Sequence, residues 1–170
     1  MQSQKGMRAY AEVKVVIEGG SCENTTTLYI ATGPAGTFKT VFTKTGNGNG
    51  IRLIGWSPNG DKLLAEVNLW EYETDTGWDH VGLIYDASSD SAREIPALDE
   101  ALSRHFGTDC EFEESIQAWK SDEQILVKVS KSPLDETYEQ HFCVERPVTF
   151  LFNLRTKTLQ GNPHAPLERR

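Results

Sequence analysis

The residues best suited to chemistry gather in one segment of the chain, EYETDTGWDH at 71–80. Carboxylates and an imidazole can hold a divalent cation, and paired carboxylates can act as the acid and base of a hydrolase. The segment supplies Glu71, Glu73, Asp75, Asp79 and His80. Their spacing does not fit a calcium loop of the EF-hand type, which needs a glycine and a later glutamate at fixed positions. The pattern therefore predicts no metal site and is typical of a solvated hairpin end.

Aromatic residues surround the same segment. Tyr72 and Trp78 lie within it, and Trp70 directly precedes it. Tyrosine and tryptophan at a loop rim favour contact with proteins or sugars, because each combines a large apolar surface with a polar group. Trp70 follows an apolar run, and we expect it to pack between sheets. The candidate binding residues are Trp78, Tyr72, Asp75, Asp79 and His80.

Other catalytic patterns are missing from the sequence. It contains no G-x-S-x-G motif, no P-loop and no dinucleotide fingerprint. His141 and Cys143 are close in sequence, but no third group that could complete a nucleophilic site is indicated. The segment GNGNG at 46–50 lacks the following helix that phosphate binding needs. The sequence therefore predicts no catalytic residue and no cofactor.

The acidic composition limits the partners. In 170 residues, 25 Asp and Glu outnumber 17 Lys and Arg, which gives a net charge of −8. Such a field repels a phosphate backbone, so nucleic acid is not an expected partner. No apolar run reaches the roughly 20 residues of a membrane helix, and the start MQSQKGMRAY has no signal-peptide core. We expect a soluble protein, either cytoplasmic or exported with its signal peptide removed.

Three cysteines leave the redox state open. They are Cys22, Cys110 and Cys143, and their spacing fits no zinc pattern. Cys110 and Cys143 are the pair that we consider for a disulfide, which would contribute about 3–4 kcal/mol by closing a loop of roughly 30 residues. Three free thiols are the alternative. The triplet Asn24-Thr25-Thr26 matches an N-glycosylation acceptor.

Alternating and β-branched residues predict strands along most of the chain. GNGNG at 46–50 is expected to be a flexible break, and Gly82 marks a candidate β-bulge. A helix is expected between Pro96 and Gly107, a residue that often ends helices. The expected parts of one domain, 1–170, are a first sheet unit at 8–45, a second at 51–95, a short helix near 97–106, a third unit at 111–160 and a loose tail at 161–170.

Two tryptophan-led segments can be aligned with one gap. LIGWSPNGDKLLAEV lies over SIQAWKSDEQ-ILVKV, so that Trp56 meets Trp119. Each segment continues through a polar loop into an apolar strand that ends in Asp or Asn and a turn, as in GLIYDASSDSAREI and TFLFNLRTKTLQ. The pattern W-S-P-[ND]-G-x-x-L followed by LIYDxxSxxxREI resembles the repeat of TolB-type β-propellers and, more loosely, of the WD type.

The resemblance covers residues 51–95 well and 112–160 weakly, while 8–45 would be a unit without its first strand. It implies an all-β fold of two to three antiparallel sheets with propeller-blade-like repeats. In such repeats the tryptophan and the turn are structural. Propellers have at least four blades, so the chain forms either an open set of sheets or part of a ring that several chains complete. An unrelated sandwich or α+β fold is the alternative.

A chain of this kind is expected to bind rather than catalyse. Unpaired strands at sheet edges accept partner strands, so we expect a non-catalytic interaction module with contacts through its loops and exposed edges. A protein partner or self-association is the expected form of binding. The alternative is a small hydrolase or carbohydrate-active domain that uses the carboxylates of the 71–80 loop.

Overall fold

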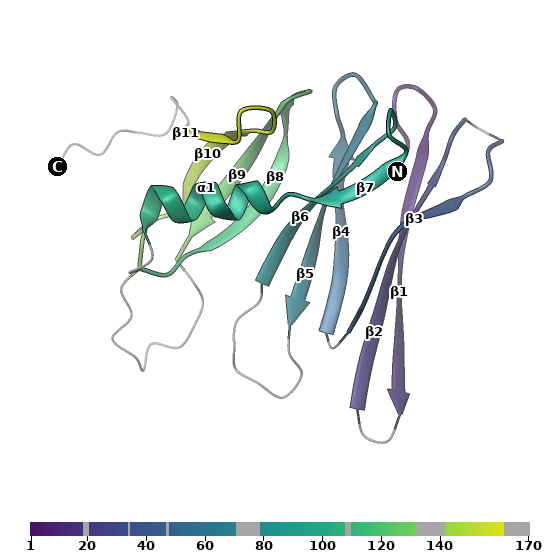
Figure 1. Ribbon diagram of the computed structural model, residues 1–170, viewed down its shortest axis with the longest axis horizontal. Coiled ribbons are helices and arrows are strands. Elements are labelled where there is room, and N and C mark those ends of the chain that lie inside the picture. Colours follow the sequence, from purple (N-terminus) through teal and green to yellow (C-terminus); the bar gives the residue numbers. More distant parts are fainter. Residues whose placement is uncertain are drawn as a thin grey trace. The chain divides into compact units, whose positions relative to one another are not determined.

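The computed structural model contains three antiparallel sheets and one short helix (Figure 1), which confirms the predicted all-β fold class. It describes residues 1–18, 21–33, 35–46, 48–70, 79–107, 110–131 and 142–161. The chain divides into two compact units, Met1–Ile95 and Pro96–Arg170. In the described part of the chain, no helix has the length and apolar character needed to span a membrane.

The first sheet has the order β1-β2-β3. Its strands are β1 (Arg8–Glu18), β2 (Ser21–Ala31) and β3 (Lys39–Gly46). β-Branched and aromatic residues, which favour a pleated surface, fill all three strands. β1 and β2 run side by side as a long ribbon (Figure 1), and their pairing is regular over the full length of β1. β1 is therefore a long strand at the edge of the sheet, and β2 is its neighbour there.

The second sheet has the order β4-β5-β6-β7. Its strands are β4 (Gly48–Trp56), β5 (Lys62–Trp70), β6 (Asp79–Asp86) and β7 (Ser91–Glu94). The core of the first unit lies between this sheet and the first one. It comprises Ala9, Leu28 and Ile30 from the first sheet and Leu63, Ala65, Val67, Leu83 and Tyr85 from the second. Trp56 packs on this core, edge-on to Tyr85, with ring centroids 6.3 Å apart.

The glycine-rich segment separates the first two sheets, as expected, but the break is shorter than 46–50, because β3 ends at Gly46 and β4 begins at Gly48. A Cβ added at Gly48 would lie 2.0 Å from Nε1 of Trp70, and one at Gly50 would lie 3.3 Å from the same ring. The indole of Trp70 thus covers the two glycines of its own sheet. Leu69 packs on the core of the first unit, and neighbouring side chains of a strand point to opposite faces, so Trp70 lies on the face of β5 that is turned away from this core.

Two buried asparagines join the two sheets of the first unit. The side-chain amide of Asn24 donates to the carbonyl of Asn49 at 3.0 Å, and that of Asn49 donates to the carbonyl of Asn24 at 2.9 Å. Both residues are 2% exposed, and Thr26, the third residue of the acceptor triplet, is fully buried. Asn24 and Thr26 are therefore part of the core, and this fold leaves no room for a glycan on Asn24.

Gly82 is not a bulge. It lies directly opposite Glu66 in a regular β5–β6 ladder, and its carbonyl accepts a hydrogen bond from the Ile95 N–H at 2.8 Å. Because its partner Glu66 is buried, glycine at this point leaves space beside a carboxylate. The register shift of this sheet lies between Leu53 and Gly55 instead.

The second unit holds the helix and the third sheet. Helix α1 (Pro96–Phe106) starts at a proline and is followed by Gly107 with a φ of 86°, as the sequence predicts. Its buried face consists of Ala97, Leu98, Ala101 and Leu102. The sheet has the order β11-β10-β9-β8, with β8 (Glu113–Ser121), β9 (Gln124–Ser130), β10 (Val148–Asn153) and β11 (Thr158–Gly161).

The sheets β4–β7 and β8–β11 share their local geometry. Trp56 lies opposite Leu63, and Trp119 lies opposite Ile125. A register shift comes just before each tryptophan, between Leu53 and Gly55 and between Ile116 and Ala118. The two tryptophans therefore occupy matching positions in four-stranded sheets of the same connectivity.

The match extends to the last turn of each sheet. The side chains of Asp86 and Asn153 accept hydrogen bonds from backbone N–H groups of the turn that follows, at 2.9 Å in each case. Four residues later, Asp90 and Lys157 have φ angles of 52° and 56°. These are the only non-glycine residues with positive φ in the described part of the chain.

Candidate interaction site

The structure describes only the end of the segment in which the binding residues were expected. Tyr72, Asp75 and Trp78 lie outside the described residues, as do the carboxylates at 71 and 73. Asp79 and His80 begin β6. Asp79 is exposed and accepts the backbone N–H of His80 at 2.9 Å, while Nδ1 of His80 lies 2.8 Å from the side-chain oxygen of Asn68 on β5.

The described end of this loop therefore has an imidazole held by an amide on the adjacent strand. Asn68 and His80 are cross-strand partners, so the contact follows directly from the register. Within the described residues, no three His, Cys, Asp or Glu side chains are placed to hold a metal ion. The hydrolase or carbohydrate alternative depends on carboxylates outside the described part of the chain and stays a prediction.

A polar chain that sequence reasoning missed joins the first two sheets. The hydroxyl of Tyr85, a residue that is 1% exposed, donates to Asp90 at 2.9 Å, and Asp90 also forms an ion pair with Lys39 on β3. The Lys39 ammonium, followed by the Tyr85 hydroxyl, lowers the pKa of Asp90 below its ordinary value of 3.8. Burial, followed by the bond to Asp90, raises the pKa of Tyr85 far above its usual range. Every polar group of this chain has a partner, which indicates a structural link.

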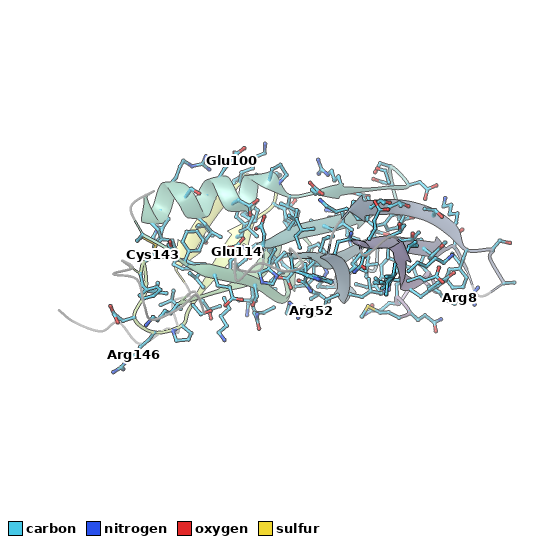
Figure 2. The ribbon with its side chains drawn as sticks, turned by 90° about the horizontal axis from the view of Figure 1, so that it is seen from below. Arg8, Arg52, Glu100, Glu114, Cys143 and Arg146 are labelled. Atoms are coloured by element: carbon cyan, nitrogen blue, oxygen red, sulfur yellow. A yellow bond between two sulfur atoms is a disulfide. The ribbon has the colours of Figure 1, made fainter. Side chains whose placement is uncertain are left out.

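A buried carboxylate on β5 is also paired. Glu66 has 3% of its side chain exposed and forms an ion pair with Arg52 on β4, the residue directly opposite; Figure 2 labels Arg52. Nε of Arg52 donates to the carboxylate at 3.1 Å. Isolated buried charges are costly, and a guanidinium partner removes most of that cost. The pair explains why a glutamate is tolerated in an apolar strand.

In the second unit, Cys110 and Cys143 are joined by a disulfide; Figure 2 labels Cys143. The bond connects the segment after α1 to the segment before β10. Next to it, the N–H of Cys143 donates to the carbonyl of Glu111 at 3.0 Å. The disulfide therefore fixes two segments that are far apart in the sequence.

Exposed apolar side chains concentrate on β1. Among the described residues, the large hydrophobic side chains that are exposed are Met1, Tyr10, Val13, Val15, Val16 and Ile17. All except Met1 lie on this one edge strand, and Ile17 is 75% exposed. Scattered apolar residues are normal on a protein surface, but a contiguous set indicates a contact surface.

Beyond Ala9, the outer side of β1 has no backbone partner among the residues that the structure describes. Ala9 exchanges both of its hydrogen bonds with Met1, at 2.8 Å each, so its N–H and C=O point away from β2. Backbone groups alternate along an antiparallel strand, and the β1–β2 register is regular. The N–H and C=O groups of Ala11, Val13, Val15 and Ile17 therefore point outward. In the described part of the chain, no backbone group bonds to them on that side.

The sequence carried a partial signal for this edge. RAYAEVKVVIE places valines and an isoleucine at both odd and even positions, whereas a half-buried strand alternates apolar and polar residues. The signal cannot show that the strand lies at an edge, because that depends on which strands pair.

The fold and the site together define an all-β protein of three antiparallel sheets with one exposed apolar edge strand. Comparison of the chain with family models, with curated proteins and with solved structures finds no match. The function must therefore be argued from the geometry.

Proposed function

We propose that this protein is a non-catalytic interaction module that binds an extended polypeptide segment along the outer edge of β1. The observation that carries the proposal is the coincidence of two features on one strand. Val13, Val15 and Ile17 each combine outward backbone donors and acceptors with an exposed apolar side chain. Strand addition uses the same combination, with backbone hydrogen bonds for affinity and side chains for specificity.

The sheets β4–β7 and β8–β11 are interpreted as propeller-blade-like repeats that serve as a scaffold. The matching tryptophan positions, register shifts and turn conformations support this interpretation. The first sheet packs on β4–β7, so its edge is ordered before binding and loses little conformational entropy when a partner binds.

A Val13→Pro substitution tests the proposed function. Proline removes the outward N–H at the centre of the edge. It leaves the β1–β2 hydrogen bonds in place, because the N–H of residue 13 points away from β2 and donates no bond to that strand. Random dodecapeptides displayed on phage are selected on the wild-type protein, and the enriched peptides are then measured against both forms. We expect the V13P protein to bind them at least about tenfold more weakly, the loss of one or two hydrogen bonds.

The matched control changes the other candidate surface. Glu71, Glu73, Asp75 and Asp79 are replaced together by amides, and peptide affinity should not change. Hydrogen exchange adds a readout in the wild-type protein, because a bound strand should protect the amides of Val13 and Val15. Enriched peptides that bind V13P and wild type equally would contradict the proposal, as would a protein that neither enriches any peptide nor self-associates.

A further inference from the structure

The β1 edge has a sequence that is complementary to itself. On one face of the strand, Tyr10, Glu12, Lys14 and Val16 follow one another at every second position. Lys14 is exposed and Glu12 is half-buried on this edge, with 68% and 43% of their side chains accessible, and the Glu12 carboxylate also accepts a hydrogen bond from the Tyr29 hydroxyl at 3.3 Å. When two copies of such a strand run antiparallel, each residue meets a residue of the other copy, and the charge order then decides which register is allowed.

One register satisfies the charges and, from Ala11 to Val15, the backbone; the ladder ends there, because Ile17 of the second copy would come opposite Ala9, whose outward groups are bonded to Met1. A two-fold axis at Val13 pairs Val13 with Val13 of the second copy and Ala11 with Val15 of the second copy. All of these residues have outward N–H and C=O groups, as a hydrogen-bonded ladder requires. The same register places Glu12 opposite Lys14 of the second copy, twice per dimer. It also places Tyr10 opposite Val16, an aromatic beside a β-branched residue.

The neighbouring registers fail on charge. An axis at Glu12 keeps outward groups opposite each other but brings the two Glu12 carboxylates together. An axis at Lys14 brings the two Lys14 ammonium groups together. Like charges directly opposite destabilise a sheet, while opposite charges stabilise it.

We propose that the partner strand for the β1 edge is β1 of a second copy of this chain, in the register centred at Val13. The inference rests on the proposed function, since it names the occupant of the same edge. Pairing would join the first sheets of two copies into one continuous six-stranded sheet, from three strands each. It would cover Val13 and Val15 on one face and Tyr10 and Val16 on the other.

The test is a charge exchange on the full chain, followed by sedimentation equilibrium over a range of concentrations. The wild type should show a reversible monomer–dimer equilibrium. Glu12→Lys or Lys14→Glu alone creates two like-charge pairs per dimer, and each variant should dimerise about tenfold more weakly.

The double variant E12K/K14E restores opposite charges and should dimerise like the wild type. An equimolar mixture of E12K and K14E should form a heterodimer with wild-type affinity, because both cross-strand pairs then join a lysine of one chain to a glutamate of the other.

Thermal unfolding at low concentration is the control for folding, since Lys14 and Glu12 also lie 3.8 Å apart within one chain. A wild type that stays monomeric would overturn this inference. Single variants that dimerise as tightly as the wild type, or a mixture that forms no heterodimer, would overturn the register. If the wild type stays monomeric but peptides bind it and do not bind V13P, the proposed function still holds and only self-pairing of β1 is contradicted. Failure of the inference and failure of the proposed function are therefore distinguishable.

Discussion

At the scale of single residues, the structure explains the polar groups as links rather than as a reactive centre. Glu66 is paired with Arg52, and the hydroxyl of Tyr85 is satisfied by Asp90. Neither contact could be predicted from the sequence, because each joins residues on different strands or a strand and a turn. The charge on Asp90 nevertheless has a consequence for stability that can be measured.

Acid should weaken the link that Asp90 makes. Its pKa in the folded chain lies below the ordinary value of 3.8, because Lys39 and then Tyr85 bind the ionised form. The stabilisation is therefore complete above the unfolded pKa and is lost as the pH falls through the lower folded pKa. We expect Asp90→Asn to be less stable than wild type at pH 7 and to lose less stability between pH 5 and pH 2. Asparagine tolerates the positive φ at this position.

Urea unfolding at a series of pH values measures this difference. Tyr85→Phe is the comparison, since it keeps the ion pair of Asp90 with Lys39 and should keep part of the acid dependence. Parallel stability profiles for wild type and Asp90→Asn would show that the carboxylate contributes nothing to the pH dependence.

At the scale of elements, the pairing of β4 with β5 depends on glycine opposite tryptophan. Gly48 and Trp70 are directly opposite each other, and a Cβ at position 48 would lie inside the space of the indole. Gly48→Ala should therefore lower the free energy of unfolding by about 1–3 kcal/mol, the usual cost of overpacking. Combined with Trp70→Ala, the same change should cost less than about 0.5 kcal/mol, and chemical denaturation of the four proteins gives the coupling.

The matched control is Gly55→Ala in the same strand, where an added Cβ meets nothing within 4 Å. It should change stability by no more than about 0.5 kcal/mol. Equal costs at Gly48 and Gly55 would contradict the role of the indole, because only an added Cβ at Gly48 meets it.

The sequence predicted those elements whose cause is local. Helix α1 was found because proline, apolar spacing and a terminal glycine all lie within or beside it, and the strands were found from β-branched residues. The start of β4 was missed because glycines read locally indicate a break, and the tryptophan that covers them lies 22 residues later. The edge position of β1 was not predicted either, because the order of strands in a sheet depends on pairing between segments that are distant in the sequence.

At the scale of the whole molecule, the chain divides into two units with different means of stabilisation. Both units bury apolar side chains, such as Leu28 in Met1–Ile95 and Phe152 in Pro96–Arg170, and the second unit also contains the Cys110–Cys143 disulfide. This cysteine pair could be considered and the end of the second sheet unit at 95 was expected from the sequence, whereas the grouping of the first two sheets into one compact unit was not, because it depends on which sheets pack together. A disulfide acts mainly on the unfolded segment that it closes, so its effect should stay within the second unit.

Replacement of Cys110 and Cys143 by alanine should therefore affect the two units differently. We expect the free energy of opening in residues 96–170 to fall by about 3–4 kcal/mol, the loop-entropy value for this separation of 33 residues. Native-state hydrogen exchange should show faster exchange at amides of β9 and β10, with those of β5 and β6 unchanged. A thiol count on the denatured, unreduced wild type should give one reactive group, Cys22. Equal acceleration in both units would mean that the chain unfolds as one cooperative structure, and three reactive thiols would mean that the bond does not form.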